Sequence, residues 1–159
     1  MEYAIRDATA EDMPSVLELI KELATFEKEA SAVEVTSDDL VHDGFGTDKR
    51  FHCFVAEADT NIVGMALIYN RYSTWKGPII HLEDLVVSET MRGSGLGTAL
   101  LNEVVKYCAD QGVKRISWEV LDWNEPAIDF YERKGAKVLR DWDVVHLDAQ
   151  GIKNYLNNL

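Results

Sequence analysis

A glycine-rich turn between an expected strand and an expected helix is the feature that most constrains how this chain folds. An apolar run over 82–87 precedes the turn, and apolar residues recur at helical spacing over 96–109. Glycine tolerates positive φ and lacks a Cβ atom, so such a turn can present its backbone amides to a ligand. The N-terminus of a helix adds unpaired N–H groups and a partial positive charge. The sequence therefore predicts an anion-binding loop, whose residues are Arg92, Gly93, Ser94, Gly95, Leu96, Gly97 and Thr98.

Spacing separates three kinds of phosphate-binding loop. A P-loop needs a lysine followed by serine or threonine, and Gly97 is followed directly by Thr98. A dinucleotide loop reads G-x-G-x-x-G at the end of a strand, whereas this chain reads G-x-G-x-G, although Glu119 lies where a ribose-binding acid would sit. The third pattern, Arg-x-x-Gly-x-Gly, is matched without a gap from Arg92 to Gly97. A turn whose glycines serve packing alone remains an alternative at this point.

The charge balance favours a cationic small molecule as partner. Against 16 Lys and Arg residues stand 28 Asp and Glu residues, which gives a net charge of −12. This charge opposes nucleic-acid binding and concentrates cations near the surface. The chain has no apolar leader and no run near the ~20 apolar residues of a membrane span. We therefore expect a cytoplasmic protein with neither a nucleic-acid nor a membrane partner.

The length and the cysteines indicate an ordinary globular chain. Its 159 residues suit a single domain over 1–159. Cys53 and Cys108 stand in no metal-binding or redox spacing, so we expect no metal site and no disulfide framework.

The expected order of elements is that of an α/β fold with a mixed sheet. Strands first follow one another through hairpins and then alternate with helices, so the sheet should be antiparallel early and parallel after the helix that starts at Gly95. Expected strands cover 3–6, 51–58, 62–72, 79–87, 116–121, 137–139 and 144–147. Expected helices start at 13, at Thr36 or Ser37, at Gly95 and at Asn124, and a last one ends the chain.

Several segments in one order carry a family resemblance. They are Leu19-Ile20-Lys21-Glu22-Leu23-Ala24, Asp43-Gly44-Phe45-Gly46, His52-Cys53, residues 72–75, Leu82-Glu83-Asp84, the Arg92 loop and Trp123-Asn124-Glu125-Pro126. Over about residues 5–135, the chain resembles the GNAT superfamily of N-acetyltransferases, in its branch of diamine (spermidine/spermine) and thialysine acetyltransferases. The resemblance implies the single-domain acyl-CoA N-acyltransferase (GNAT) fold, a mixed twisted sheet flanked by helices. It also implies acetyl-CoA as co-substrate and a homodimer, for which Trp142 and the last helix offer a surface.

Acetyl transfer to an amine by direct attack needs a base and an acid. An amine of pKa ~10.4 is neutral at pH 7 only at a cost of about 4.6 kcal/mol. Glu83 lies on the strand before the loop, and the resemblance assigns it the base role. Plain alternation would send Glu83 and Asp84 to opposite faces of the sheet, whereas a bulge would let both reach the acceptor. The resemblance places Tyr131 near the coenzyme sulfur, as the acid that protonates the leaving thiolate.

The resemblance also implies contacts to both substrates. Backbone groups of Leu85, Val86 and Val87 would meet the pantetheine arm, the Arg92 loop would hold the pyrophosphate, and Asn124 and Ala127 would contact the coenzyme. The acceptor site would comprise Glu27, Trp75, Glu83, Asp84 and Glu119. Spermidine enzymes carry an acidic residue and proline where this chain has Ser73-Thr74, so the match is nearer to the thialysine branch.

The sequence thus predicts an acetyl-CoA-dependent N-acetyltransferase that acts on a small primary amine, a thialysine-like amino acid or a polyamine. Three alternatives remain from the sequence alone. One is a non-catalytic acyl-CoA-binding regulatory module, and another is an acetyltransferase of protein N-termini or lysines. The third is a nucleotide-binding oxidoreductase subunit, which rests on Gly93 to Gly97 with Glu119.

Overall fold

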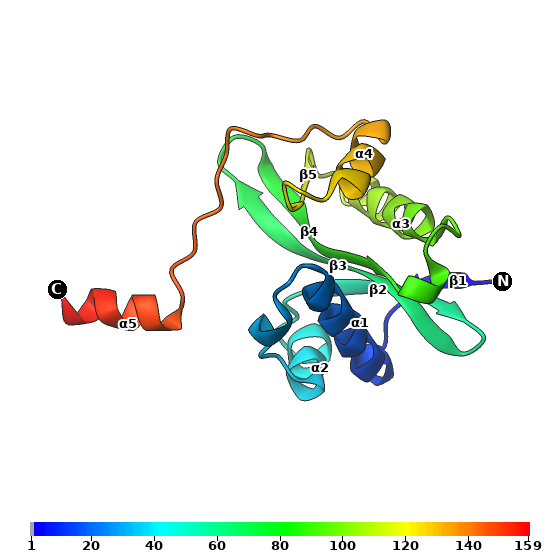
Figure 1. The fold of residues 1–159 in the computed structure, drawn as a ribbon, viewed down its shortest axis with the longest axis horizontal. Helices are drawn as coiled ribbons and strands as arrows, with labels where there is room; N and C mark the ends of the chain where they lie inside the picture. Colours follow the sequence, from blue (N-terminus) through cyan, green and yellow to red (C-terminus); the bar gives the residue numbers. More distant parts are fainter. Residues whose placement is uncertain (1) are drawn as a thin grey trace. The chain divides into compact units, whose positions relative to one another are not determined.

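The computed structural model describes residues 2–159, in two compact units that divide after Glu119. The first unit contains a five-stranded sheet in the order β1-β2-β3-β4-β5 (Figure 1). Its strands are β1 (Ala4–Asp7), β2 (His52–Ala58), β3 (Asn61–Ser73), β4 (Gly77–Val87) and β5 (Ile116–Ser117). The first four pair antiparallel, and β5 pairs parallel to β4. The expected mixed sheet is confirmed.

Helices cover both faces of this sheet (Figure 1). Three are α-helical, namely α1 (Met13–Phe26), α2 (Ser37–Phe45) and α3 (Leu96–Asp110). Short 3-10 turns lie at Ala10–Asp12, Ala30–Ala32 and Glu89–Met91. The hairpin between β2 and β3 turns at Asp59 and Thr60, both with positive φ, as a tight turn between twisted strands requires.

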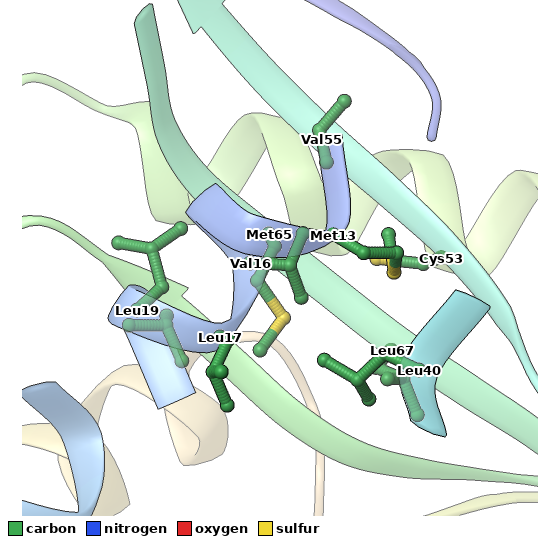
Figure 2. Close-up of a cluster of buried hydrophobic side chains, with 10 residues drawn as sticks. Met13, Val16, Leu17, Leu19, Leu40, Cys53, Val55, Met65 and Leu67 are labelled. Carbon is green, nitrogen blue, oxygen red and sulfur yellow. The ribbon is translucent and has the colours of Figure 1, made fainter. Parts of the chain in front are cut away.

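The main core lies between the sheet and the helices α1 and α2, and we call this side the α1 face. Figure 2 shows the inward stripe of α1 against side chains of β2 and β3. Helical spacing of Met13, Val16 and Leu17 makes that stripe, and each such buried side chain contributes about 1.5–3 kcal/mol. Leu67 of β3 belongs to this core, so alternate residues along β3 point toward α1.

Helix α3 packs on the other face, and Gly64 permits its close approach. A Cβ atom at Gly64 would lie 2.6 Å from Leu96 Cδ2 and 3.0 Å from the Val86 carbonyl oxygen. A larger residue would therefore displace the first turn of α3. This contact ties the position of the glycine-rich loop to the middle of the sheet.

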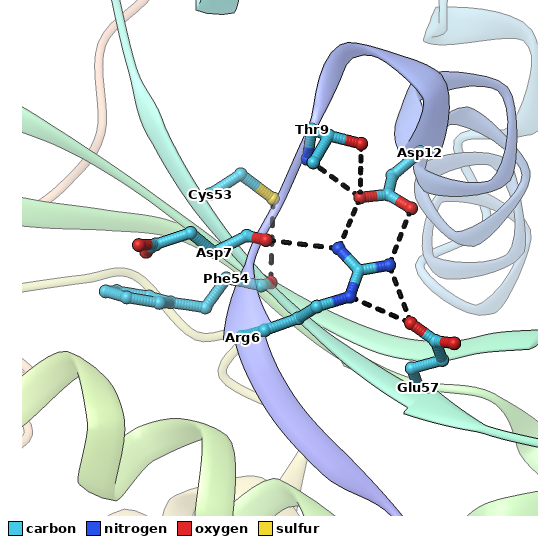
Figure 3. Close-up of polar contacts among 7 residues, drawn as sticks. All are labelled: Arg6, Asp7, Thr9, Asp12, Cys53, Phe54 and Glu57. Carbon is cyan, nitrogen blue, oxygen red and sulfur yellow. Dashed lines mark hydrogen bonds and ion pairs between the residues drawn. The ribbon is translucent and has the colours of Figure 1, made fainter. Parts of the chain in front are cut away.

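A partly buried ion network fixes the start of α1 (Figure 3). Arg6 of β1 donates to both Asp12 carboxylate oxygens, at 2.7 and 3.0 Å, and to Glu57 of β2 at 2.8 Å. Asp12 also accepts from the Thr9 backbone N–H at 2.8 Å. The hydrogen bonds from Arg6 lower the pKa of Asp12 most, so this carboxylate stays ionised and anchors α1 to the sheet edge.

The second unit, residues 120–159, contains two helices. Helix α4 (Glu125–Arg133) is capped by Asn124, as expected, and α5 (Ala149–Asn157) is capped by Asp148. The strand expected over 116–121 forms only at Ile116–Ser117, and the strands expected over 137–139 and 144–147 are wrong. Residues 139–150 are all exposed, so the alternating apolar pattern there has no strand partner to pair with. The expectation of one domain over 1–159 stays a prediction.

Candidate active site

The glycine-rich loop has the backbone of an anion-binding turn. Gly93 and Gly95 have φ of 77° and 86°, and a Cβ atom at either would meet nothing within 4 Å. Conformation, and not space for a neighbouring side chain, therefore requires glycine here. Gly95 is the N-cap of α3, and no side chain caps that helix. The first-turn N–H groups of this 15-residue helix therefore have no side-chain acceptor at their N-cap. They are available to donate hydrogen bonds to a phosphate group.

Helix α1 supports this loop from the side. A Glu22 carboxylate oxygen accepts the Glu89 backbone N–H at 2.8 Å and lies 3.5 Å from Arg92 Nη2. The Arg92 guanidinium also lies over the Phe26 ring, 5.8 Å from its centroid. Because the Arg92 side chain is still half exposed, its remaining N–H groups can bind an anion.

Among the residues that the structure describes, strand β4 has an edge beside the loop that no strand pairs with. It pairs with β3 over its whole length, but with β5 only at Ile80 and His81. In an antiparallel ladder, alternate residues turn their N–H and C=O groups to each side. Half of the backbone groups of residues 82–87 therefore face away from β3. The expected contacts of Leu85, Val86 and Val87 with an extended ligand stay a prediction, which this open edge supports.

A bulge in β4 brings Glu83 and Asp84 to the same face. Asp84 pairs with Leu67, and Leu82 pairs with Ile68, so Glu83 is the extra residue. Since Leu67 belongs to the α1-face core, Asp84 points to that face as well. His81 pairs with Tyr69, which lies two residues beyond Leu67 on β3, so His81 is on the α1 face too. Glu83 shares this face, because its Oε2 lies 3.7 Å from His81 Nε2. The bulge that the sequence reasoning considered is confirmed.

Burial and two neighbouring carboxylates raise the pKa of Asp84 on this face. Burial raises the pKa of Asp84 to about 6, and the negative charges of Glu83 and Glu27 add to that rise. Glu27 is the C-cap of α1, and its own pKa is raised by burial and by Glu29. A carboxylate whose pKa is raised by burial and by charged neighbours in this way is typical of functional sites. An ammonium group would relieve the repulsion between these carboxylates.

His81 is a site residue that the sequence reasoning missed. Its ring is buried, with Nδ1 2.8 Å from Ser117 Oγ and 3.3 Å from Arg71 Nη1. Arg71 can only donate, so Nδ1 accepts and the proton lies on Nε2, which faces Glu83. Burial lowers the pKa of His81, and Arg71 lowers it further against the opposing effect of Glu83. The imidazole is therefore neutral at pH 7 and presents an N–H group to Glu83.

Tyr69 and Arg71 complete what we call the polar cluster: Glu27, Tyr69, Arg71, His81, Glu83 and Asp84. The rings of Tyr69 and His81 lie 5.3 Å apart. Burial raises the pKa of the Tyr69 phenol, and the Glu83 charge raises it further. The one sequence signal for His81 was its place two residues before Glu83 within an apolar strand.

The remaining expected acceptor residues, Glu119 and Trp75, are not part of the polar cluster. Exposed Glu119 follows β5 and acts electrostatically on His81 and Tyr69. Trp75, exposed by 78%, sits in the turn between β3 and β4. There Ser73 Oγ accepts the backbone N–H groups of Trp75 and Lys76, so Ser73 has a structural role in this turn.

The second unit carries the other expected residues on one helix. Asn124 accepts the Ala127 backbone N–H at 3.4 Å as the N-cap of α4. Asn124, Ala127 and Tyr131 are spaced by three and four residues, so they share one side of α4. The Tyr131 ring lies 5.3 Å from Phe130. The roles of these three residues stay predictions.

Within residues 2–159, no group of three or more His, Cys, Asp or Glu side chains is arranged to hold a metal ion. Among the helices of the same residues, none is long and apolar enough to cross a membrane.

The chain matches known acetyltransferases in sequence, and it matches a solved structure in fold. The model of the acetyltransferase (GNAT) family matches residues 13–136. The thialysine N-epsilon-acetyltransferase of Bos taurus is 38% identical over 160 residues, which cover 94% of each chain. The spermidine/spermine N(1)-acetyltransferase-like protein 1 of Homo sapiens is 34% identical over 91% of this chain and 22% of its own length. An integron cassette protein of V. cholerae shares the fold, with a TM-score of 0.79 at 19% identity over 98% of each chain. The chain belongs to the acetyltransferase (GNAT) family, and it is an N-acetyltransferase.

Proposed function

We propose that this N-acetyltransferase moves the acetyl group of acetyl-CoA to a small primary amine, with a thialysine-like amino acid as the preferred acceptor. The observation that carries the proposal is the bulge at Glu83, which gathers Glu83, Asp84 and Glu27 on the α1 face of β4. These three carboxylates together attract an ammonium ion. The relatives named thialysine N-epsilon-acetyltransferase, 38% identical in Bos taurus, support this choice of acceptor.

Glu83 acts as the base in this proposal. The amine nitrogen attacks the thioester carbonyl carbon, a C–N bond forms, and the C–S bond breaks. Glu83 takes the amine proton, directly or through water, and the His81 Nε2–H group that faces it at 3.7 Å helps to orient its carboxylate. Tyr131 then gives its phenol proton to the leaving thiolate.

The loop and the edge of β4 hold acetyl-CoA. The α3 amides and the Arg92 guanidinium take the pyrophosphate, and the free backbone groups at Leu85, Val86 and Val87 take the pantetheine arm. Asn124 and Ala127 contact the coenzyme from α4. These assignments fit the left-handed Gly93 and Gly95 of the loop, where a Cβ atom would meet nothing within 4 Å.

We also propose a cytoplasmic homodimer. Trp142, Val145 and Leu156 expose 67%, 88% and 62% of their surface, and Ile152 lies on the same helix as Leu156. A second copy of the chain would cover these apolar side chains. Sedimentation at several concentrations tests this. Dimers of ordinary affinity form at about 100 µM, so a monomer at that concentration would overturn the proposal.

The acceptor assay tests the function itself. The protein is incubated with acetyl-CoA and, in separate samples, thialysine, lysine, spermidine or an unstructured lysine-containing peptide. Free CoA and the acetylated product are measured. We expect thialysine to be used at least as well as spermidine, and a much larger kcat/KM for spermidine or the peptide would overturn the acceptor assignment.

The variant Glu83→Gln tests the base in the same assay. It should lose turnover most strongly at neutral pH and recover partly at high pH, where the amine is already neutral. An unchanged pH profile would remove Glu83 from this role.

A further inference from the structure

Arg71 places a guanidinium group among the carboxylates of the polar cluster. Along β3, Leu67, Tyr69 and Arg71 alternate onto the α1 face, and Arg71 Nη1 lies 3.3 Å from His81 Nδ1. On the other side of the same imidazole, Nε2 lies 3.7 Å from Glu83. A neutral ring thus separates a cation from the carboxylate proposed as the base.

Arg71 forms no ion pair within residues 2–159. Within residues 2–159, no carboxylate oxygen lies within 4.0 Å of its guanidinium, whose one hydrogen-bond contact is to His81. The side chain is exposed, so most of its five N–H donors remain open to solvent or ligand. A guanidinium in this state binds carboxylates through two parallel hydrogen bonds.

A polyamine would gain nothing from this residue. All its charged groups are ammonium ions, so Glu83, Asp84 and Glu27 attract them while Arg71 repels them. An amino acid with a distal amine carries both kinds of charge. Its ammonium groups suit the carboxylates, and its carboxylate suits the guanidinium.

We propose that Arg71 binds the carboxylate of the acceptor and so selects amino acids over polyamines. The proposal rests on the proposed function, because it takes Glu83 as the place of the reacting amine. Arg71 and Glu83 are separated by one imidazole and its two contacts. A molecule of lysine length can therefore reach both, and its α-ammonium group, which shares a carbon with the carboxylate, would lie at the Arg71 end, where Glu119 acts electrostatically on His81 and Tyr69.

The experiment compares acceptors that differ only in this carboxylate. Lysine or thialysine is compared with lysinamide and with 1,5-diaminopentane, which keep the amine and chain length. Their kcat/KM values are measured for the unmodified protein and for Arg71→Gln, Arg71→Lys and Arg115→Gln. Arg115 is the matched control, because it is a half-buried arginine of the same unit whose guanidinium donates to Ser73 Oγ at 3.4 Å.

We expect Arg71→Gln to lower kcat/KM for the amino acids by about 5- to 50-fold, mainly through KM. The values for lysinamide and 1,5-diaminopentane should stay the same or rise. Arg71→Lys should keep part of the preference, and Arg115→Gln should keep all of it. In the unmodified protein the preference should shrink as salt is added, because the contact is between charges near the surface.

Different results would contradict the proposed function and the role of Arg71. If the unmodified protein acetylates none of these amines, both the proposed function and the role of Arg71 are wrong. If amines are acetylated but Arg71→Gln leaves the ratio of amino acid to diamine unchanged, the proposed function survives and the role of Arg71 is wrong. Loss of the preference in Arg115→Gln instead would assign the carboxylate to Arg115. Circular dichroism and thermal melting show whether each variant is folded.

Discussion

Nε2 of His81 faces Glu83 across the bulge in β4, at 3.7 Å from Oε2. The opposite ring nitrogen accepts from Arg71, so the nitrogen facing Glu83 carries the proton. This arrangement makes His81 a positioning residue for the carboxylate, and it does not need to touch the acceptor. The groups around the pair are Tyr69, Arg71, Ser117 and Glu119.

His81→Leu should lower kcat by about 2- to 10-fold and leave the amine KM nearly unchanged, because Glu83 loses the polar group that faces it and is held less well in position. His81→Gln should keep most of the activity, because its amide nitrogen replaces Nε2. Equal kcat values in the Leu and Gln variants would contradict the role of the Nε2–H group.

Asp84→Asn should stabilise the protein above pH 6. Because the folded-state pKa of Asp84 is raised to about 6, the folded protein binds more protons than the unfolded chain between about pH 4 and pH 6. Stability is therefore lost as the pH rises through this window. Removing the charge should restore on the order of 2–3 kcal/mol at pH 8 and almost nothing at pH 4.

Urea unfolding at pH 4, 6 and 8 measures this difference. The matched control is Asp141→Asn, at an exposed aspartate in the second unit. A gain for Asp84→Asn that is the same at pH 4 and pH 8 would show that the buried charge is not its cause. Amine turnover should fall in the same variant, because the acceptor site loses one carboxylate.

Gly95→Ala should weaken CoA binding by about 10- to 100-fold, because the first-turn amides of α3 lose their alignment. Gly112→Ala is a close control, since Gly112 has a φ of 69° and a Cβ atom there would also meet nothing within 4 Å. Both substitutions introduce left-handed strain of about 1–2 kcal/mol. Calorimetry with CoA separates the effects, and equal affinities in the two variants would refute the loop assignment.

Tyr131→Phe should retain the fold and CoA affinity and lose about 10²–10⁴-fold in kcat. Only the hydroxyl is removed, so ring packing against Phe130 is preserved. The defect should leave the amine KM nearly unchanged, because the phenol acts in the transition state. Tyr155→Phe, at an exposed tyrosine of α5, serves as the control. Near-native kcat in Tyr131→Phe would assign the tyrosine to packing.

Local patterns predicted the glycine turn between a strand and a helix, because it depends on neighbours along the chain, and they left the bulge as one of two possibilities. Positive φ at Gly95 follows from a strand that meets a helix, and the pair Glu83 and Asp84 can share a face only through a bulge. His81 and Arg71 were missed for the opposite reason. They meet through the pairing of β3 with β4, and that register is not visible in either strand alone.

The strands expected over 137–139 and 144–147 failed on the same physical ground. Alternation of apolar residues describes a strand with one buried face, and it needs a neighbouring strand to pair with. Val144, Val145 and Leu147 are exposed by 59%, 88% and 59%, so no buried face exists for them within the described residues.

The open edge of β4 beyond His81 affects the stability and the solubility of the protein. An unpaired strand edge is a template for aggregation, and β4 leaves such an edge along residues 82–87. A ligand that forms hydrogen bonds with this edge covers it for as long as the ligand stays bound. Thermal stability and solubility should therefore follow the concentration of acetyl-CoA, so that depletion of the donor both stops the reaction and shortens the lifetime of the enzyme.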